Sequence, residues 1–360
     1  MSLAQPKRIL IIKLRHHGDV LLSTPVVDAL KTRFPDCEID MLVYAGTEQL
    51  IADNPQIAQI FTIDRNWKKL GVFKQLACEK NLFSKLKARD YDWAFNLSDQ
   101  WRAAIIAKLC ARCSVGLDCI KRDGFWWRFC HDFINHELDP SHHIVENQLN
   151  ILAPLIQPED VADAKVRLWV AQDARESMRQ KLREQGWNGE DYVLLHPGAR
   201  WHFKCWEDGK NAAIVQLLLN SGQNVVLTAS PDTVEQYMLQ EIIGRLNIPE
   251  GRKVYVLSGC LSLRELAAAI EGAKLFVGVD SAPMHIAAAL DKPQIALFGA
   301  SWVDKWRPYS EQAEVIYAGD YAKLPHPDSI DTNDPTRLLK AIPLQDVWDK
   351  ISAKLEALEA

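Results

Sequence analysis

The sequence predicts an α/β protein built from two successive doubly wound domains. Its 360 residues exceed what one ordinary hydrophobic core organises and suit two domains of about 150–200 residues each. Apolar, strand-like runs alternate with helical patterns in both halves, which is typical of parallel sheets covered by helices on both faces. A polar stretch at 157–165 separates the two series and has the composition of an interdomain connection.

The first series begins with an apolar strand at 8–14, followed by a short loop and a helical pattern at 20–32. The pattern predicts further strands at 38–44, 59–63 and 92–97, and further helices at 70–88, 101–112 and 144–156. Between 114 and 140 aromatic and basic residues mix and the pattern loosens. We therefore expect an N-terminal domain over residues 1–165.

The second series has five strand-like runs, at 192–198, 224–230, 253–257, 275–281 and 293–301. Helical patterns lie between or beside them at 206–221, 232–246, 262–271 and 283–290. The chain ends in an amphipathic helix at 344–359, in which apolar residues recur at helical spacing. We expect a C-terminal domain over residues 166–340 and a separate terminal helix within 341–360.

Composition excludes several classes of function. The net charge of −5 argues against a nucleic-acid partner, which calls for a basic footprint. Eight scattered cysteines include one CxxC at 110–113 but no second pair or histidine pair, so buried thiols are favoured over a zinc site. The apolar run at 9–12 is too short for a signal peptide or a membrane span. We expect a cytoplasmic protein whose membrane contact, if any, is peripheral.

The first chemically informative segment is HHGDVLLSTPVVDAL at 16–30. Gly18 permits a sharp turn after the first strand, and Asp19 then stands at or near the first turn of a helix. A helix cap is one interpretation of Asp19, because a carboxylate is stabilised there. A general base that accepts a proton from an acceptor hydroxyl is the other, and the two roles can coexist.

The second segment is HPGARWHFKCW at 196–206, which follows the first strand of the second series. Gly198 allows a ligand to approach the backbone closely, and Arg200 and Lys204 supply positive charge just beyond it. Fixed cations and backbone N–H groups are what a diphosphate leaving group needs. An ordinary basic surface loop is the alternative.

The third segment is VGVDSAPMHIAAAL at 277–290. A buried strand leads to Asp280 and Ser281, and a helix of small residues starts near Pro283. The free N–H groups of such a helix start form an anion site that needs no lysine. Asp280 is expected to accept hydrogen bonds from sugar hydroxyls, with a helix cap as the alternative. His285 is either a ligand neighbour or a buried, hydrogen-bonded histidine.

Two further features lie after strands of the second series. Glu235 falls within the helix that follows the run at 224–230, where it could bind ribose hydroxyls; a solvated surface glutamate is the alternative. The loop FGASWVDKWRP at 298–308 follows another strand near the same edge. The chain contains no GxGxxG dinucleotide fingerprint and no P-loop, which argues against a nicotinamide enzyme or an ATPase.

Taken in order, these segments resemble the bacterial heptosyltransferases of glycosyltransferase family 9. The matching pieces are 13–30, 196–206, 257–299 and 306–308, so the resemblance runs over nearly the whole chain. The block from VGVDSAPMHIAAAL to PQIALFG is highly specific for that family. The segments RHHGD and HPGARWHFKCW are most similar to the enzymes that add the third, branching heptose.

The resemblance implies a GT-B fold: two Rossmann-like domains facing across a cleft, with the C-terminal helix returning to the N-terminal domain. It implies inverting transfer from ADP-L-glycero-β-D-manno-heptose to the lipopolysaccharide inner core of a Gram-negative cell, with no metal or other cofactor. No DxD motif stands in a suitable loop, and the helix start near Pro283 would replace a metal.

The resemblance also assigns roles by position. Asp19 matches the catalytic base, Lys204 the cation beside the donor phosphates, Glu235 the ribose-binding carboxylate and Asp280 the heptose-contacting aspartate. The remaining donor-binding candidates are His196, Gly198, Arg200, Ser281, Ala282, Met284 and His285. The loop before Lys204 is longer than in some members, which leaves the choice between Arg200 and Lys204 open.

The acceptor implied by the resemblance is anionic, and the N-terminal half has two basic segments, at 64–74 and 120–131. The candidate acceptor contacts there are Arg65, Lys68, Lys69, Arg122 and Arg128. Solvated charge is the alternative. The aromatic cluster at 125–129 could rest on the cytoplasmic leaflet of the inner membrane, but core packing is the favoured interpretation.

Other functions are weighed against this one. Addition of the first or second heptose, to Kdo-lipid A or to the first heptose, is the nearest alternative. A sugar-nucleotide epimerase would need a nicotinamide fingerprint and a Tyr-x-x-x-Lys pair, and neither is present. A nucleotide-sugar-binding protein without activity is the alternative from another class.

Overall fold

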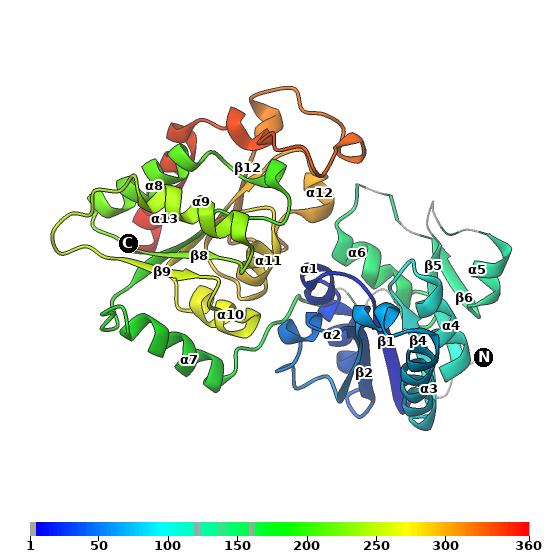
Figure 1. Cartoon of the computed structure of the whole chain (residues 1–360). Helices are drawn as coiled ribbons and strands as arrows, with labels where there is room; N and C mark the ends of the chain where they lie inside the picture. The colour runs from blue at the N-terminus through cyan, green and yellow to red at the C-terminus, as the bar shows by residue number, and fades with distance from the viewer. Residues whose placement is uncertain are drawn as a thin grey trace. The chain divides into compact units, whose positions relative to one another are not determined.

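The structure, a computed structural model, describes residues 5–118, 122, 124–136, 138–139, 141–157, 161 and 163–359. The chain divides into two compact units, residues 1–169 and 170–360, each built around one sheet (Figure 1). The polar connection expected at 157–165 lies partly outside the described residues. Among the helices that the structure describes, none is long and apolar enough to cross a bilayer.

The first unit contains a six-stranded parallel sheet in the order β3-β2-β1-β4-β5-β6. Its strands are β1 (Arg8–Lys13), β2 (Glu38–Tyr44), β3 (Gln59–Ile63), β4 (Tyr91–Asn96), β5 (Ala111–Asp118) and β6 (Phe133–His136). Its α-helices are α1 (His17–Leu21), α2 (Thr24–Arg33), α3 (Val72–Ala88), α4 (Trp101–Cys110), α5 (Phe125–Phe129) and α6 (Ile144–Leu149). Short 3-10 turns are η1 (Thr47–Leu50), η2 (Arg65–Lys69) and η3 (Asn150–Leu152).

Alternate residues of β1 bury their side chains on opposite faces of this sheet, as the pleat requires. Ile9 and Ile11 pack with α2 and η3, whereas Leu10 and Ile12 pack with α3 and α4. All four are fully buried. This explains why the central strand is a continuous apolar run rather than an alternating one.

The second unit repeats the arrangement, with a parallel sheet in the order β12-β11-β10-β7-β8-β9. Its strands are β7 (Tyr192–His196), β8 (Asn224–Ala229), β9 (Val254–Ser258), β10 (Leu275–Val279), β11 (Gln294–Phe298) and β12 (Ala313–Tyr317). Its α-helices are α7 (Gln172–Arg183), α8 (Asp208–Asn220), α9 (Thr233–Ile243), α10 (Leu263–Glu271), α11 (Ala282–Ala289), α12 (Val303–Trp306) and α13 (Leu344–Glu359). The 3-10 turns are η5 (His202–Lys204), η6 (Ala318–Asp320), η7 (Pro327–Ser329) and η8 (Leu338–Ala341).

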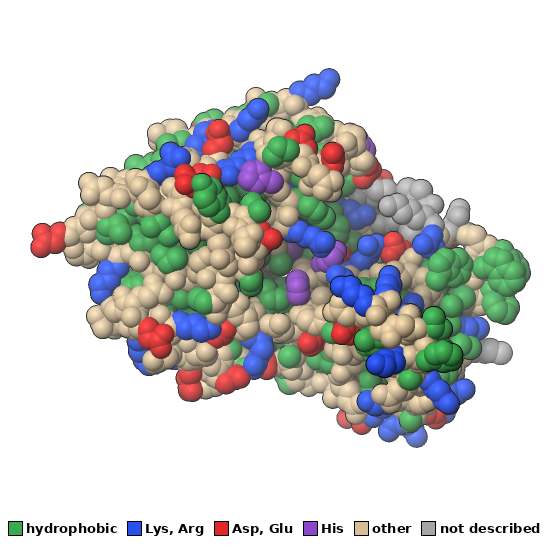
Figure 2. All heavy atoms as spheres, viewed as in Figure 1, with side chains coloured by type: hydrophobic (Ala, Val, Ile, Leu, Met, Phe, Trp, Pro, Cys, Tyr) green, Lys and Arg blue, Asp and Glu red, His purple; other side chains and the backbone are tan. Residues whose placement is uncertain are grey.

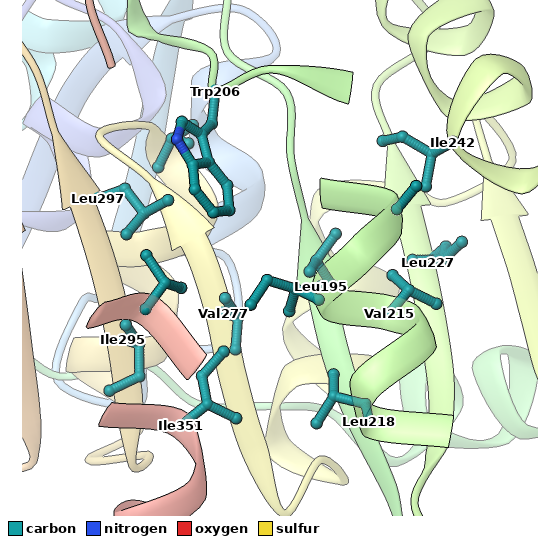
Figure 3. Close-up of a cluster of buried hydrophobic side chains, with 14 of the residues drawn as sticks. Leu195, Trp206, Val215, Leu218, Leu227, Ile242, Val277, Ile295, Leu297 and Ile351 are labelled. Carbon is teal, nitrogen blue, oxygen red and sulfur yellow. The ribbon is translucent and has the colours of Figure 1, made fainter. Parts of the chain in front are cut away.

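The terminal helix α13 belongs to the core of the second unit. Its Val347, Ile351 and Leu355 are buried with residues of α8 and of the sheet. Figure 3 shows Ile351 of this helix beside Val277 of β10. The apolar stripe of this helix, which was expected to return to the N-terminal domain, is covered within the C-terminal unit.

The helix expected at 20–32 is two helices in the structure. Pro25 occupies the first turn of α2, where its missing N–H interrupts the hydrogen-bond ladder. Ser23 and Thr24 instead donate their hydroxyl protons to the carbonyl oxygens of Val20 and Leu21, at 2.6 and 2.8 Å. The break separates a short helix bearing Asp19 from the longer one that packs on the sheet.

Several elements have no counterpart in the sequence prediction. Strand β5 begins within the helix expected at 101–112 and continues into the stretch where the pattern loosens. Strands β6 and β12 lie at sheet edges, each pairing with one neighbour, and their sequences are short and only partly apolar. Helix α7 does carry an amphipathic signal, because Ala174, Met178 and Leu182 recur every four residues and are buried.

Candidate active site

Both sheets have the strand order 3-2-1-4-5-6 of a doubly wound fold, counted from the first strand of each unit. In such sheets a crevice opens at the carboxyl ends of the two central strands, where the direction of winding reverses. These strands are β1 and β4 in the first unit, and β7 and β10 in the second. The three motif segments singled out in the sequence follow β1, β7 and β10 directly.

Asp19 lies in the first turn of α1, immediately after β1. The N-cap of this helix is His16, and no side chain caps it. Asp19 is partly exposed, and its carboxylate makes no hydrogen bond or ion pair with another described residue. The cap interpretation of Asp19 is therefore wrong, and the carboxylate is available to a ligand.

A polar network fixes the backbone that carries Asp19. The N–H of Leu14 donates to Ser98 Oγ at 2.6 Å, and Gln100 Nε2 donates to the Leu14 carbonyl at 2.8 Å. Tyr44, at the end of β2, donates its hydroxyl proton to Gln100 Oε1 at 2.5 Å. Ser98, Gln100 and Tyr44 were missed in the sequence, although each follows or ends a predicted strand.

His17 is a second residue that sequence reasoning missed. It lies two residues before Asp19 in the sequence. Burial lowers the pKa of His17, with smaller contributions from His16 and Arg65, whereas nearby Glu48 acts in the opposite direction. A neutral imidazole can exchange hydrogen bonds with a sugar hydroxyl in either direction. The two consecutive histidines before Gly18 are the sequence feature that could have identified His17.

Of the five acceptor candidates, Arg65 and Arg122 lie at the carboxyl ends of the central strands. Arg65 donates to the Arg15 carbonyl at 3.3 Å and stacks over Tyr44. Arg122 donates to the Asp99 carbonyl at 2.9 Å, and Asp99 in turn pairs with Arg15 at 2.7 Å. Arg65 and Arg122 thus contact the two neighbouring loops that follow β1 and β4.

The other three acceptor candidates lie elsewhere in the first unit. Arg128 of α5 pairs with buried Asp118 at the end of β5, at 2.6 Å. Lys68 and Lys69 are exposed in η2 and have no ion-pair partner among the described residues.

The aromatic cluster at 125–129 divides into two environments. Trp127 is 1% exposed and packs edge-on against Trp101 of α4. Phe125, Trp126 and Phe129 are exposed by 72%, 69% and 63%. The core-packing interpretation therefore holds for Trp127 alone and is wrong for its three neighbours.

In the second unit, the turn after β7 is shaped around Glu235. A Cβ atom on Gly198 would lie 2.4 Å from Glu235 Oε2, so a larger residue there would displace the Glu235 side chain. Glu235 is buried in the first turn of α9, where Oε2 accepts the Ser230 N–H at 3.0 Å. The solvated-surface interpretation of Glu235 is therefore wrong, and Asp232 is the residue that caps α9.

His196, the last residue of β7, is buried beside Glu235. Its Nε2 lies 3.8 Å from Glu235 Oε2, and its Nδ1 lies 2.8 Å from the Thr228 hydroxyl oxygen of β8. Burial lowers the pKa of His196 more than the Glu235 carboxylate raises it, so the imidazole is neutral. His196, at the end of β7, therefore contacts both Thr228 of β8 and Glu235 in the first turn of α9.

Lys204 and Asp280 meet at the carboxyl edge of the same sheet. Lys204 Nζ lies 2.5 Å from Asp280 Oδ2, and Ser301 donates its hydroxyl proton to the same oxygen at 2.6 Å. Asp280 is buried and Lys204 is mostly so. Asp280 therefore does not cap α11, whose N-cap is Ser281. Ser301, in the loop after β11, is a further residue at this edge.

Arg200 and Lys204 occupy different surroundings. Arg200 is exposed and stacks over Trp201, 5.8 Å from the ring centroid. Lys204 lies 5.2 Å from the same ring but reaches Asp280 at the end of β10. Of the two cations, Lys204 is the one that the fold brings to the carboxyl edge of the central strands.

Helix α11 starts directly behind Asp280. The N–H groups of Ser281 and Ala282 donate to no described residue, and Pro283 has none to donate. Met284 and His285 of the same helix are buried, so they pack beneath this turn rather than facing solvent. Two unbonded N–H groups at a helix start, beside an ammonium group, are suited to bind a phosphate oxygen.

Comparison with known proteins places this arrangement in a family. Residues 80–336 match the family model for glycosyltransferase family 9 (heptosyltransferase). Over 335 residues the chain is 37% identical to lipopolysaccharide heptosyltransferase 3 of Escherichia coli, covering 93% of this chain and 95% of that protein.

Solved structures agree on the fold. A family 9 glycosyltransferase from Veillonella parvula superposes with a TM-score of 0.83, at 21% identity, over 99% of both chains. The E. coli ADP-heptose lipopolysaccharide heptosyltransferase II superposes with a TM-score of 0.77, at 23% identity, over 98% of this chain and 100% of the other. The fold is GT-B, as the resemblance implied, and the chain is a member of glycosyltransferase family 9, the heptosyltransferases.

Proposed function

We propose that this protein transfers L-glycero-D-manno-heptose from ADP-L-glycero-β-D-manno-heptose to the lipopolysaccharide inner core, adding the third, branching heptose to the second. The observation that carries the proposal is its 37% identity to a lipopolysaccharide heptosyltransferase 3 along nearly the whole chain. Identity to a heptosyltransferase 2 from Salmonella typhimurium over the same share of this chain is 25%.

Asp19 is proposed as the general base. Its carboxylate is partly exposed and has no partner among the described residues, so it is free to accept the proton of an acceptor hydroxyl. The resulting alkoxide attacks the anomeric carbon, the bond to the diphosphate breaks on the opposite face, and the configuration inverts. The transition state has oxocarbenium character.

The C-terminal unit is proposed to bind the donor. Lys204 and the N–H groups of Ser281 and Ala282 would stabilise the charge that develops on the departing diphosphate. Glu235, held by the Ser230 N–H, would accept hydrogen bonds from the ribose. Asp280 would accept them from the heptose hydroxyls, and His196, Gly198, Met284 and His285 would shape the pocket.

The first unit is proposed to bind the anionic acceptor through Arg65 and Arg122, with Arg128, Lys68 and Lys69 further out. Because that acceptor is carried on lipid A, the protein would act at the cytoplasmic face of the inner membrane as a peripheral protein. Nucleic acid is not proposed as a partner.

Purified lipopolysaccharide cores truncated at successive heptoses test the acceptor. We expect ADP-heptose-dependent product with cores that end at the second heptose, and none with cores that lack it. Product on Kdo-lipid A or on the first heptose would replace this proposal with addition of the first or second heptose. Donor binding without product on any core would indicate an inactive nucleotide-sugar-binding protein.

The transfer is proposed to need no metal, because Lys204 and the start of α11 provide the positive potential that a divalent ion supplies elsewhere. We expect the initial rate in excess EDTA to stay within about twofold of the rate with Mg²⁺. A rate that vanishes in EDTA and returns with Mg²⁺ would contradict this mechanism.

A further inference from the structure

The outer surface of α3, α4 and α5 in the first unit is both apolar and cationic. We propose that this surface, the α3–α4–α5 face, docks the protein on an anionic lipid bilayer. The inference rests on the proposed function, in which the acceptor is carried on a lipid. It goes further by naming which part of the protein meets the membrane and by which forces.

The first turns of α3 present large apolar side chains to solvent. Phe73 is 90% exposed, and Val72 and Leu76 are exposed by 79% and 64%. All three lie within one and a half turns, so they form a continuous patch rather than scattered residues. The buried face of α3 is formed instead by Leu82 and Leu86, which pack on the sheet.

Helix α4 extends the patch. Trp101, Ile105 and Leu109 recur every four residues on its outer side, and all three are exposed. An open groove of about 490 Å³ runs between α3 and α4. Apolar side chains of both helices line the groove, Leu76 and Ile105 among them, together with Lys80 and the ion pair of Arg102 and Glu79.

Helix α5 continues the same surface. Its buried Trp127 packs against Trp101 with ring centroids 5.6 Å apart, which fixes α5 next to the start of α4. Phe125, Trp126 and Phe129 then point outward from this five-residue helix. Figure 2 shows hydrophobic side chains gathered over α5. Tryptophan and phenylalanine on an amphipathic surface favour the headgroup–acyl boundary of a bilayer.

Positive charge surrounds these side chains. The segment 64–88 carries seven Lys or Arg residues against two acidic ones, in a protein whose net charge is −5. None of the seven has an ion-pair partner among the described residues, and Arg65 and Lys87 lie over the aromatic rings of Tyr44 and Phe83. The other five are exposed: Lys68, Lys69, Lys74, Lys80 and Lys85. Unpaired lysines beside exposed aromatic residues are complementary to anionic headgroups above an apolar layer.

The same charges argue against a second copy of this chain as the occupant. An isologous dimer through the α3–α4–α5 face would bring the two sets of lysines together, and like charges at close range repel. An anionic membrane satisfies the lysines and the aromatic residues at once. We therefore assign the face to lipid.

Flotation with lipid vesicles tests the assignment on the full-length protein. We expect it to float with vesicles of phosphatidylglycerol and phosphatidylethanolamine, and to stay in solution with vesicles of phosphatidylcholine alone. Raising the salt concentration should weaken the binding, because headgroup attraction is screened. Equal flotation with both kinds of vesicle, or none with either, would overturn the proposal.

Substitutions separate the apolar contribution from the cationic one. Phe73→Asp with Trp126→Ser should abolish flotation, whereas the matched change Ile248→Asp, at an exposed apolar residue of the second unit, should not affect it. Lys80→Glu with Lys85→Glu should weaken binding by at least about 25-fold, at about fivefold for each cation lost. The control Arg183→Glu, in α7, should leave it within about twofold.

Activity distinguishes this proposal from the function on which it rests. The variants should retain full turnover on a soluble, delipidated core oligosaccharide and lose turnover only on vesicle-embedded acceptor. Flotation that persists while no acceptor is glycosylated would sink the proposed function but leave the docking surface intact. A concentration-dependent dimer that Phe73→Asp dissociates, with no flotation, would assign the face to a second copy instead.

Discussion

Single residues account for the chemistry proposed for this protein, and Asp19 is the first that can be tested. Asp19→Asn keeps the shape of the side chain but removes its capacity to accept a proton. We expect kcat to fall by about 10²- to 10⁴-fold, with little change in the KM for ADP-heptose. Asp36→Asn, at an exposed carboxylate of the same unit, should leave kcat unchanged. An Asp19→Asn enzyme with near-normal turnover would remove Asp19 as the base.

Lys204 and Arg200 are distinguished by what their side chains reach. Lys204→Ala removes the ammonium group beside Asp280, so we expect the KM for ADP-heptose to rise by about 10- to 100-fold. Arg200→Ala removes an exposed cation and should change that KM by less than about threefold. Steady-state kinetics on the two variants measures both effects, and the reverse order would move the diphosphate contact to Arg200.

Among the secondary-structure elements, the turn after β7 packs closely against the first turn of α9, where Gly198 lies against Glu235. Gly198→Ala would place a methyl group 2.4 Å from Glu235 Oε2 and displace that side chain. We expect the KM for ADP-heptose to rise by about tenfold and kcat to change little. Gly209→Ala in α8 is the matched control, because a Cβ there meets nothing within 4 Å.

A double-mutant cycle checks that Gly198 acts through Glu235. If it does, Gly198→Ala combined with Glu235→Ala should cost no more than Glu235→Ala alone. Additive effects of the two substitutions would instead indicate that Gly198 contacts the donor independently. Melting temperatures of the four proteins show whether either change disturbs the fold.

At the scale of the whole molecule, each unit buries a neutral histidine. Asn96 Nδ2 can only donate to His131 Nε2, at 3.2 Å, so His131 carries its proton on Nδ1 and donates to the Trp127 carbonyl. Burial lowers the pKa of His131 in the first unit and of His196 in the second, both from a usual value of 6.5.

The sign of the resulting pH dependence follows from proton binding. Below pH 6.5 the unfolded chain binds a proton at each of these histidines while the folded chain resists it, so the free energy of unfolding falls as the pH drops. Urea unfolding at a series of pH values from about 7.5 to 5.5 measures this slope.

His131→Asn provides the check on that slope. It lowers stability at every pH but should make the free energy of unfolding less dependent on pH between these values. His326→Gln, at an exposed histidine, should leave the slope unchanged. A slope that is the same in His131→Asn and in the unaltered protein would show that other groups govern it.

Much of this architecture could be predicted, because long apolar strands and periodic helices identify themselves locally. Helix α13 has the bounds expected from its periodicity, and β3 matches its predicted run residue for residue. Strands β5, β6 and β12 were missed because each is short or only partly apolar, so its residues do not stand out along the chain. The proline that divides α1 from α2 was visible in the sequence, but its effect depends on the hydroxyl groups that replace the lost bond.

The fold class, the family and the segments that carry the site could be predicted from the sequence, because each is indicated by residues close together along the chain. Tertiary contacts distinguish Asp19 from Asp280: the first carboxylate has no partner among the described residues, and the second is paired with Lys204 from 76 residues away. They also decide which side chains of the cluster at 125–129 face solvent and where α13 packs. Pairing and burial depend on contacts between distant segments, which local patterns do not contain.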